Sequence, residues 1–309
     1  MYNINVTKFW RTDMKKILAL FFAIIILAIP LSGCNGPAKN PNPESDFKYE
    51  EENGGIKILW YIGKSETVVI PNEIQNLPVT KLGGQAFMKN NLVTSVIMPD
   101  TVVEIRDDCF SECSKLESIT LSKNLELIGE RAFYKCTSLK HITIPSKTNV
   151  IGYIAFESSG LETIVFEEGL EIIGGYGSFA RTKIKEIRLP STAREIGDSA
   201  FGANPDLETV VLNEGLVTIG HKAFVANPKL KEIVIPKTVK YVTYQDFNAC
   251  SGLKKVKFEG NAPETFEFTY TDPDLDIKKT WDLDFTVYYH EGATGFTSPT
   301  WYGYKTEIW

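Results

Sequence analysis

The 309-residue sequence predicts a mainly β protein, a curved solenoid in which short parallel strands stack along one axis. Three observations predict this fold class. A phenylalanine behind a small residue recurs every 22 or 23 residues, an alternating apolar group recurs within each interval, and a second apolar group ending in glycine follows it. The phenylalanines mark about eight 23-residue repeats and are Phe87, Phe110, Phe133, Phe156, Phe179, Phe201, Phe224 and Phe247.

Each repeat has two halves. The first half follows a Leu-x-x-Ile-x-Leu pattern, as in residues 116–121, and its final alternation predicts a short strand with one face inward. In four repeats a proline follows this strand and ends it by removing an amide donor. The second half ends on a glycine such as Gly129, which we expect to supply a turn with positive φ. A unit of this size buries its apolar face only against its neighbours, so the repeats must stack.

This frame resembles the leucine-rich repeats of the BspA type, which are found in bacterial surface proteins. Residues 68–83 resemble the longer first unit of that family, so we place the solenoid with its N-terminal cap unit at residues 53–262. The resemblance implies a surface-displayed scaffold for protein binding or adhesion, without catalysis and without a cofactor.

The N-terminus has the pattern of an export signal. A basic Met-Lys-Lys at residues 14–16 precedes an apolar run at 17–29, which is too short for a spanning helix and fits a signal peptide. The run ends in Leu-Ser-Gly-Cys, which resembles a bacterial lipobox with Cys34 as the lipidated residue. We therefore expect a lipoprotein signal peptide at residues 1–33, with a true start at Met14 as the simplest account of the first 13 residues.

A lipid on Cys34 would anchor the protein to the bacterial cell envelope or cell surface. Residues 34–52 begin with a stretch rich in Asn and Pro, and we expect them to form a disordered tether between the lipid and the folded part.

The frame breaks after Phe258, and residues 263–309 are rich in aromatic residues. We favour a C-terminal capping segment, because the open end of a solenoid must be covered. The functional alternative is a glycan-binding envelope protein that stacks sugars on Trp281 and Trp301, if these side chains are exposed.

Three cysteines share one position of the repeat, three residues after the phenylalanine. Cys113 and Cys136 would be neighbours at roughly one strand spacing, about 4.8 Å. Two interpretations stay open: a pair of buried thiols, or a strained disulfide. A metal site is disfavoured because no histidine shares the column.

Nothing else in the sequence indicates catalysis. The three histidines are scattered, and no metalloprotease, nucleophile-elbow or phosphate-loop motif is present, so we expect no catalytic residues, no metal and no cofactor. The formal net charge of −6 argues against a nucleic-acid partner. We expect a monomer whose partner is a protein, including a host or matrix protein, or a glycan.

The outward positions of the strands define candidate surfaces. The first outward column alternates in sign from Glu117 to Lys231 and predicts a cross-strand charge ladder. In the second half-repeat, Leu127, Val150 and Ile172 stand in three successive units and form a candidate apolar flank patch. The central outward column is a candidate interaction strip: Ile97, Thr120, Thr143, Val165, Arg188, Val211 and Val234.

Overall fold

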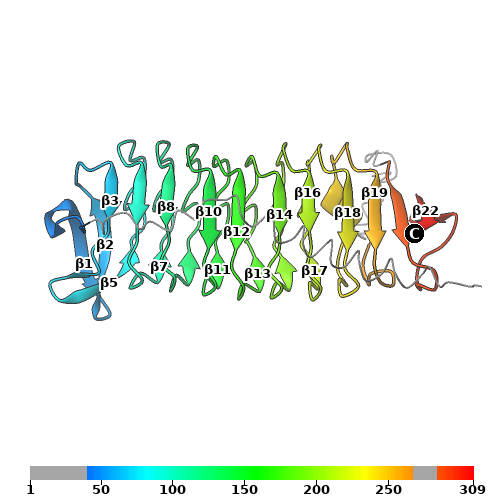
Figure 1. Ribbon diagram of the computed structural model, residues 1–309, viewed down its shortest axis with the longest axis horizontal. Coiled ribbons are helices and arrows are strands. Elements are labelled where there is room, and N and C mark those ends of the chain that lie inside the picture. Colours follow the sequence, from blue (N-terminus) through cyan, green and yellow to red (C-terminus); the bar gives the residue numbers. More distant parts are fainter. Residues whose placement is uncertain (1–39, 267–283) are drawn as a thin grey trace, which may run out of the picture. The chain divides into compact units, whose positions relative to one another are not determined.

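The computed structural model describes residues 40–266 and 284–309, and the part from Pro41 to Trp309 is one compact unit. This unit is a parallel β solenoid, as predicted (Figure 1). From β6 to β17, each coil contributes a strand of three or four residues from its first half and a two-residue strand from its second half. Two short 3-10 elements are the helical segments of the described ranges: η1 (Glu44–Asp46) and η2 (Tyr244–Phe247).

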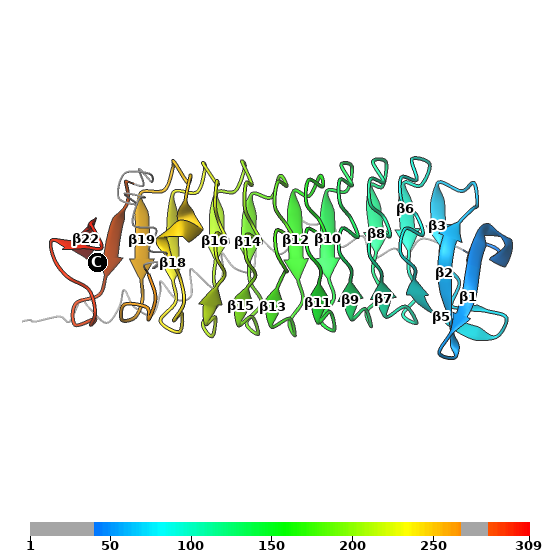
Figure 2. The same ribbon diagram turned by 180° about the vertical axis from the view of Figure 1, so that it is seen from behind.

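The first-half strands lie side by side along the axis and form a surface that we name the strand wall (Figures 1 and 2). They pair in parallel with an offset of one repeat, so that Ile142 faces Ile164 and Ile187 faces Val210. The strands of the wall are β3 (Thr67–Val69), β6 (Ser95–Ile97), β8 (Ser118–Thr120), β10 (His141–Ile144), β12 (Thr163–Phe166), β14 (Glu186–Arg188), β16 (Thr209–Val211), β18 (Glu232–Ile235), β19 (Lys255–Phe258), β20 (Thr286–Tyr289) and β22 (Tyr304–Ile308).

The second-half strands form a separate surface, which we name the flank. These strands are also parallel, with Leu127 facing Val150 and Glu195 facing Thr218. They are β5 (Leu77–Leu82), β7 (Glu104–Ile105), β9 (Leu127–Ile128), β11 (Val150–Ile151), β13 (Ile172–Ile173), β15 (Glu195–Ile196) and β17 (Thr218–Ile219).

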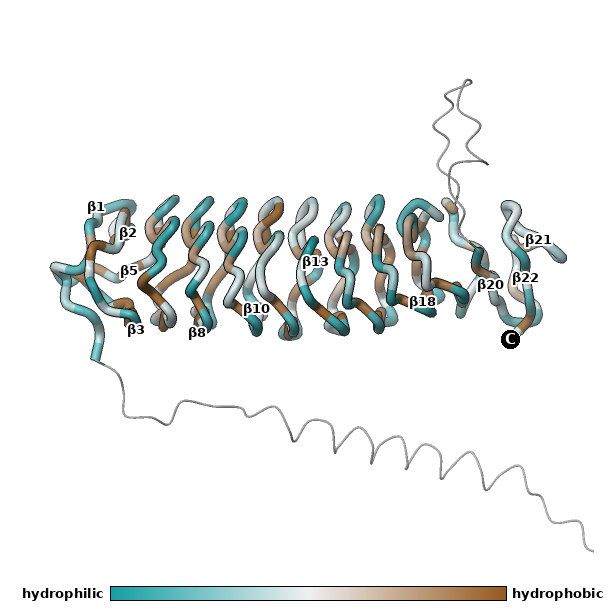
Figure 3. The backbone as a smooth tube through the Cα atoms, turned by 90° about the horizontal axis from the view of Figure 1, so that it is seen from above, coloured by the Kyte–Doolittle hydropathy of each residue, from teal (hydrophilic) through white to brown (hydrophobic). Residues whose placement is uncertain are grey.

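The core lies between the strand wall and the flank. All eight repeat phenylalanines are fully buried and stack ring on ring, with centroids 4.8–6.4 Å apart. Such offset stacks are favourable beyond the burial of apolar area. Coloured by hydropathy, apolar segments recur from coil to coil (Figure 3). The repeat frame predicted from the sequence is therefore confirmed.

The turns around each phenylalanine differ from the prediction. In seven of the eight repeats, positive φ falls two residues before and two residues after the phenylalanine, on residues such as Arg131 and Lys135. The repeat glycines serve close approach instead. A Cβ atom added at Gly129 would lie 2.6 Å from the backbone nitrogen of Asp107, so a side chain there would collide with the preceding coil.

The N-terminal end also corrects a predicted boundary. Residues 47–52, predicted as part of the tether, form strand β1 (Phe47–Glu52), which pairs antiparallel with β2 (Gly55–Tyr61). A further strand, β4 (Glu73–Ile74), pairs with β5. Tyr61 extends the aromatic column, with its ring stacked 5.3 Å from that of Phe87. Because Phe47 buries its ring against Tyr61, the chain before residue 53 belongs to the folded unit.

At the other end, the described part of the C-terminal segment continues the strand wall. β20 pairs in parallel with β19, and β22 pairs in parallel with β20. A short strand, β21 (Thr300–Trp301), then turns back and pairs antiparallel with β22. The segment therefore adds two parallel strands to the wall and a short hairpin at its end.

Candidate binding surfaces

The column that contains the cysteines is a hydrogen-bonding column at the turns. The Sγ atoms of Cys113 and Cys136 lie 2.9 Å and 3.0 Å from the carbonyl oxygens of Phe87 and Phe110, to which they donate. In a later repeat, Asn227 fills the same role by donating Nδ2 to the oxygens of Phe201 and Phe224. In these repeats a small donor at this position provides a partner for the phenylalanine carbonyls that are buried at the turn.

The four cysteines among the described residues are free thiols and are buried. Cys113 and Cys136 are therefore a thiol pair, and the alternative of a disulfide is not formed in this structure. Burial raises the pKa of Cys113 to about 12 and raises that of Cys136 as well. Such thiols are poor nucleophiles and poor metal ligands, because the thiolate is the reactive form.

The candidate interaction strip lies on the outer face of the strand wall. Its members face one another in register where the strands pair, as Ile97 faces Thr120 and Thr143 faces Val165. Ile97 and Val234, at its two ends, are half-buried. The five residues between them are exposed: Thr120, Thr143, Val165, Arg188 and Val211.

The predicted charge ladder beside the strip is largely absent. Of the alternating pairs, Lys140 and Glu162 form an ion pair with a distance of 3.5 Å between Nζ and Oε1. In the other pairs of neighbouring residues of this column, between residues 117 and 231, the charged side-chain nitrogen and oxygen atoms are more than 4 Å apart. These side chains therefore face water rather than each other. Long side chains at strand spacing gain little from holding one geometry in solvent. The wall therefore presents charges of both signs along its edge.

The candidate flank patch is partly exposed. Leu127 is half-buried, whereas Val150 and Ile172 are 50% and 52% exposed. The structure adds two residues that the sequence analysis missed, Tyr153 and Tyr176, which are 63% and 58% exposed. Their rings lie 6.5 Å apart at an angle of 70°. The signal in the sequence was the replacement of an acidic residue by tyrosine at one repeat position in two successive units, next to Val150 and Ile172.

Trp301 lacks the exposure that the glycan-binding alternative requires. Trp301 is 5% exposed, because its ring packs 4.4 Å from the ring of Phe266 and 5.8 Å from that of Phe258. An indole held inside an aromatic cluster has no face left for a sugar. Trp281, the other predicted stacking residue, and Cys34, the predicted lipidation site, lie outside the described residues.

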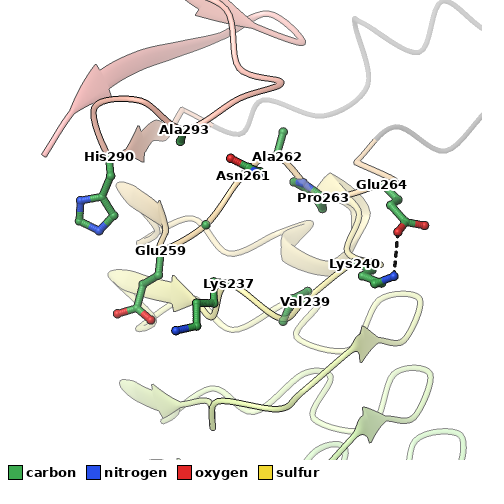
Figure 4. Close-up of a pocket in the computed structure, with 11 residues that line it drawn as sticks. Lys237, Val239, Lys240, Glu259, Asn261, Ala262, Pro263, Glu264, His290 and Ala293 are labelled. Atoms are coloured by element: carbon green, nitrogen blue, oxygen red, sulfur yellow. Dashed lines mark ion pairs between the residues drawn. The ribbon is translucent and has the colours of Figure 1, made fainter.

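A cavity of about 590 Å³ lies where the last repeats meet the C-terminal segment. Lys237, Glu259 and His290 lie at one end, and an ion pair of 3.1 Å between Lys240 and Glu264 lies at the other (Figure 4). Burial and the neighbouring carboxylate of another glutamate raise the pKa of Glu259. The cavity is open, and its charges of both signs offset one another, so it favours no single class of ligand.

Two further observations concern chemistry and membranes. Within residues 40–266 and 284–309, no group of three or more His, Cys, Asp and Glu side chains is arranged to hold a metal ion. In the same ranges, no helix has the length and apolar character needed to cross a bilayer.

The parallel 23-residue coils, the phenylalanine column and the donor column at the turns define a leucine-rich-repeat solenoid. The chain belongs to the BspA-type leucine-rich-repeat family. The family described as "BspA type Leucine rich repeat region (6 copies)" matches residues 61–177 and 175–276, which is more than half of the chain.

Several solved structures are similar to this chain. One is the T. pallidum leucine-rich-repeat protein, with 26% identity over 74% of this chain and 85% of that chain and a TM-score of 0.39. A second is a leucine-rich-repeat protein from Bacteroides ovatus, with 24% identity over 69% of this chain and 70% of that chain and a TM-score of 0.47. A third is the pneumococcal vaccine antigen PcpA, with 17% identity over 82% and 94% of the two chains and a TM-score of 0.39. The comparison with curated proteins gives no match.

Proposed function

We propose that this protein is exported, anchored by a lipid on Cys34 and displayed on the bacterial cell surface, where it binds a protein partner without catalysis. The interaction strip of the strand wall is the proposed contact surface. The observation that carries the proposal is the row of five exposed residues from Thr120 to Val211, which runs across neighbouring strands of the strand wall. Members of repeat families of this kind are typically binding proteins, because stacked coils present extended surfaces.

The composition of the strip supports a protein partner. Val165 and Val211 are 47% and 38% exposed, with Arg188 between them and threonines before them. A mixture of aliphatic, hydroxyl and guanidinium groups suits a protein interface, where apolar contacts are surrounded by polar ones. None of the seven strip residues is aromatic, so the strip offers no ring on which a sugar could stack.

Binding is tested with residues 35–309, which keep the compact unit 41–309 intact. The purified protein is assayed against a panel of extracellular-matrix proteins and against a glycan array. We expect saturable binding to a protein, and we expect Val165→Glu combined with Val211→Glu to weaken it by roughly tenfold or more. Lys123→Glu serves as the matched control, because Lys123 is 84% exposed at a turn away from the strip. Binding to glycans alone, or equal binding by the strip variant, would contradict the proposal.

The anchor is tested separately in the full chain. We expect metabolic labelling with a fatty acid and partition into detergent for the wild type, and loss of both in Cys34→Ser. Labelling that persists in Cys34→Ser would place the lipid elsewhere.

A further inference from the structure

The exposed apolar side chains of the flank are concentrated in two adjacent repeats. One repeat contributes Val150 and Tyr153, the next contributes Ile172 and Tyr176, and each of these side chains is at least half exposed. We name these four residues the flank dyad, because they form two pairs, one in each of the two repeats. At a strand spacing of about 4.8 Å, two repeats offer a patch roughly 10 Å wide, which matches two or three residues of a partner. Large apolar side chains gathered in this way mark interaction sites more often than scattered ones do.

Carboxylates flank the dyad on both sides, although apolar Leu127 occupies the coil directly before Val150. In register with Val150 and Ile172 stand Glu104, two coils before Val150, and Glu195, one coil after Ile172. The two tyrosines occupy the position three residues before the repeat phenylalanine, which we call the tyrosine position. At this position the two preceding coils have Asp107 and Glu130, and the following coil has Asp198.

Two of the three carboxylates at the tyrosine position, Asp107 and Asp198, have a structural role that the tyrosines do not fill. Asp107 Oδ1 accepts a hydrogen bond of 2.8 Å from the backbone N–H of Glu130. Asp198 Oδ1 accepts one of 2.8 Å from the backbone N–H of the next coil. A tyrosine has no carboxylate with which to cap the following turn. Stability of the turn therefore does not explain why Tyr153 and Tyr176 stand here.

The dyad is also held in place. Gly175 lies beneath the ring of Tyr153, since a Cβ atom added at Gly175 would be 3.1 Å from Cδ1 of that ring. The ring of Tyr176 stands nearly perpendicular to it at 6.5 Å. A partner that docks on preorganised side chains loses less entropy than one that must order them.

The border of the dyad carries unneutralised negative charge. Among the described residues, the carboxylates of Glu126, Glu171 and Glu195 form no ion pair within 4 Å. Of the nearby arginines, Arg131 forms ion pairs with Asp108 and Glu130, whereas Arg194 donates to a backbone carbonyl and keeps its positive charge, so three carboxylates stand against this one guanidinium. A cationic partner gains from this field, which steers its approach and fixes its register.

We propose that the flank dyad docks a short cationic segment of a partner protein, in which an aliphatic or aromatic residue stands between lysines or arginines. The apolar residue contacts the aliphatic side chains of the dyad and the tyrosine rings, and the cations face the carboxylates and the ring faces. The proposal rests on the proposed function of the solenoid as a protein-binding scaffold, but it uses a different surface.

Two other occupants fit less well. A sugar ring stacks on coplanar aromatic faces, and the two tyrosine rings are 70° apart. A second copy of this chain, docked dyad to dyad, would bring Glu126, Glu171 and Glu195 against their own counterparts, and like charges placed together at an interface are unfavourable.

The test uses residues 35–309 and a fluorescent eight-residue peptide with Leu-Phe at its centre, two lysines on each side and a glycine at each end. Binding is followed by fluorescence anisotropy at low and at physiological salt. We expect the wild type to bind, the combined Tyr153→Ser and Tyr176→Ser variant to bind roughly tenfold more weakly or worse, and affinity to fall with salt. Tyr241→Ser is the matched control, because Tyr241 is an exposed tyrosine on the same flank outside the dyad. We expect its affinity to stay within about twofold of the wild type.

Peptides with glutamates in place of the lysines, or with Ser-Ser at the centre, should bind roughly tenfold more weakly. A second variant, Glu126→Gln with Glu171→Gln and Glu195→Gln, leaves the tyrosines in place and should reduce both the affinity and its salt dependence. It keeps the test valid if the tyrosine variant fails to fold.

The proposal is overturned by any of four results. These are no binding to the wild type up to about 1 mM peptide, equal binding by the tyrosine variant, equal binding of the glutamate peptide, or a dimer in sedimentation that the tyrosine variant abolishes. The strip variant with glutamates at Val165 and Val211 should still bind the peptide. Failure of the strip proposal is therefore distinguishable from failure of this one.

Discussion

The spacing of the phenylalanine rings predicts that equal substitutions will cost unequal amounts of stability along the solenoid. Phe133 and Phe224 are both fully buried and both have a ring neighbour on each side. The neighbours of Phe133 lie 5.2 Å and 4.9 Å away, whereas those of Phe224 lie 5.9 Å and 6.4 Å away. We therefore expect Phe133→Leu to be more destabilising than Phe224→Leu.

The magnitude follows from the terms that differ. The lost burial and the small cavity are nearly the same at two fully buried sites. Together these two terms cost about 1 kcal/mol at either site. A stacked aromatic pair contributes about 0.5–1.5 kcal/mol beyond its area, and dispersion falls steeply with separation. We take about 1 kcal/mol for each pair near 5 Å and about 0.5 kcal/mol for each pair near 6 Å. Phe133→Leu then costs about 3 kcal/mol and Phe224→Leu about 2 kcal/mol.

The measurement is urea unfolding of residues 35–309, followed by far-UV circular dichroism and by intrinsic fluorescence. Coincident transitions with unchanged m values justify comparing free energies directly. Both sites are interior repeats, so each substitution disturbs two coil interfaces and chain-end effects cancel. Equal costs for the two variants, within about 0.3 kcal/mol, would refute the stacking argument and leave burial alone as the cause.

Three further predictions concern pH, thiols and close approach. Burial raises the pKa of Asp246 to about 7. The contribution of this side chain to stability is therefore present near pH 4 and is lost as pH rises towards 7, a fall on the order of 4 kcal/mol. Asp246→Asn should flatten this fall, as measured by urea midpoints at both pH values. The four cysteines of residues 35–309 should all react with a thiol reagent after unfolding without reductant, and none should react rapidly in the native protein; two missing thiols would reveal a disulfide. A Cβ atom at Gly197 would lie 2.1 Å from the carbonyl oxygen of Gly174. Gly197→Ala should therefore lower the free energy of unfolding by about 2 kcal/mol or more, measured by thermal or urea unfolding. A decrease under about 0.5 kcal/mol would show that the coils separate easily.

The interior of the solenoid could be predicted from the sequence because it repeats. A residue such as Phe156 occupies the same environment as its counterparts 23 residues away, so the period alone identifies the buried column. The shared position of the cysteines could be located for the same reason, although their role as donors to the phenylalanine carbonyls became visible only in three dimensions.

The ends and the outer surface could be predicted less well, because their environment is not repeated. Trp301 was a candidate of the glycan-binding alternative, which required it to be exposed, yet it packs into the aromatic cluster beside Phe266. Residues 47–52 resemble a polar tether in composition, yet their backbone pairs with β2. The charge ladder failed because strand register brings Cα atoms together, whereas long side chains at the surface choose their own directions in water.

Two binding surfaces are compatible with one scaffold because the inward and the outward columns have different roles. Stability resides in columns that face inward or close the turns, such as the phenylalanine stack and the donors to its carbonyls. The outward columns contribute little to that network, so Val165 on the strand wall and Tyr153 on the flank are free to differ from their counterparts in other repeats.

The flank dyad departs from its column at two positions in the same two coils, and at the tyrosine position it gives up the carboxylate that caps the next turn elsewhere. A departure that forgoes a local hydrogen bond and exposes a large ring is costly unless another molecule covers it. We therefore expect the dyad to be the more selective of the two surfaces, and the strip the more extensive.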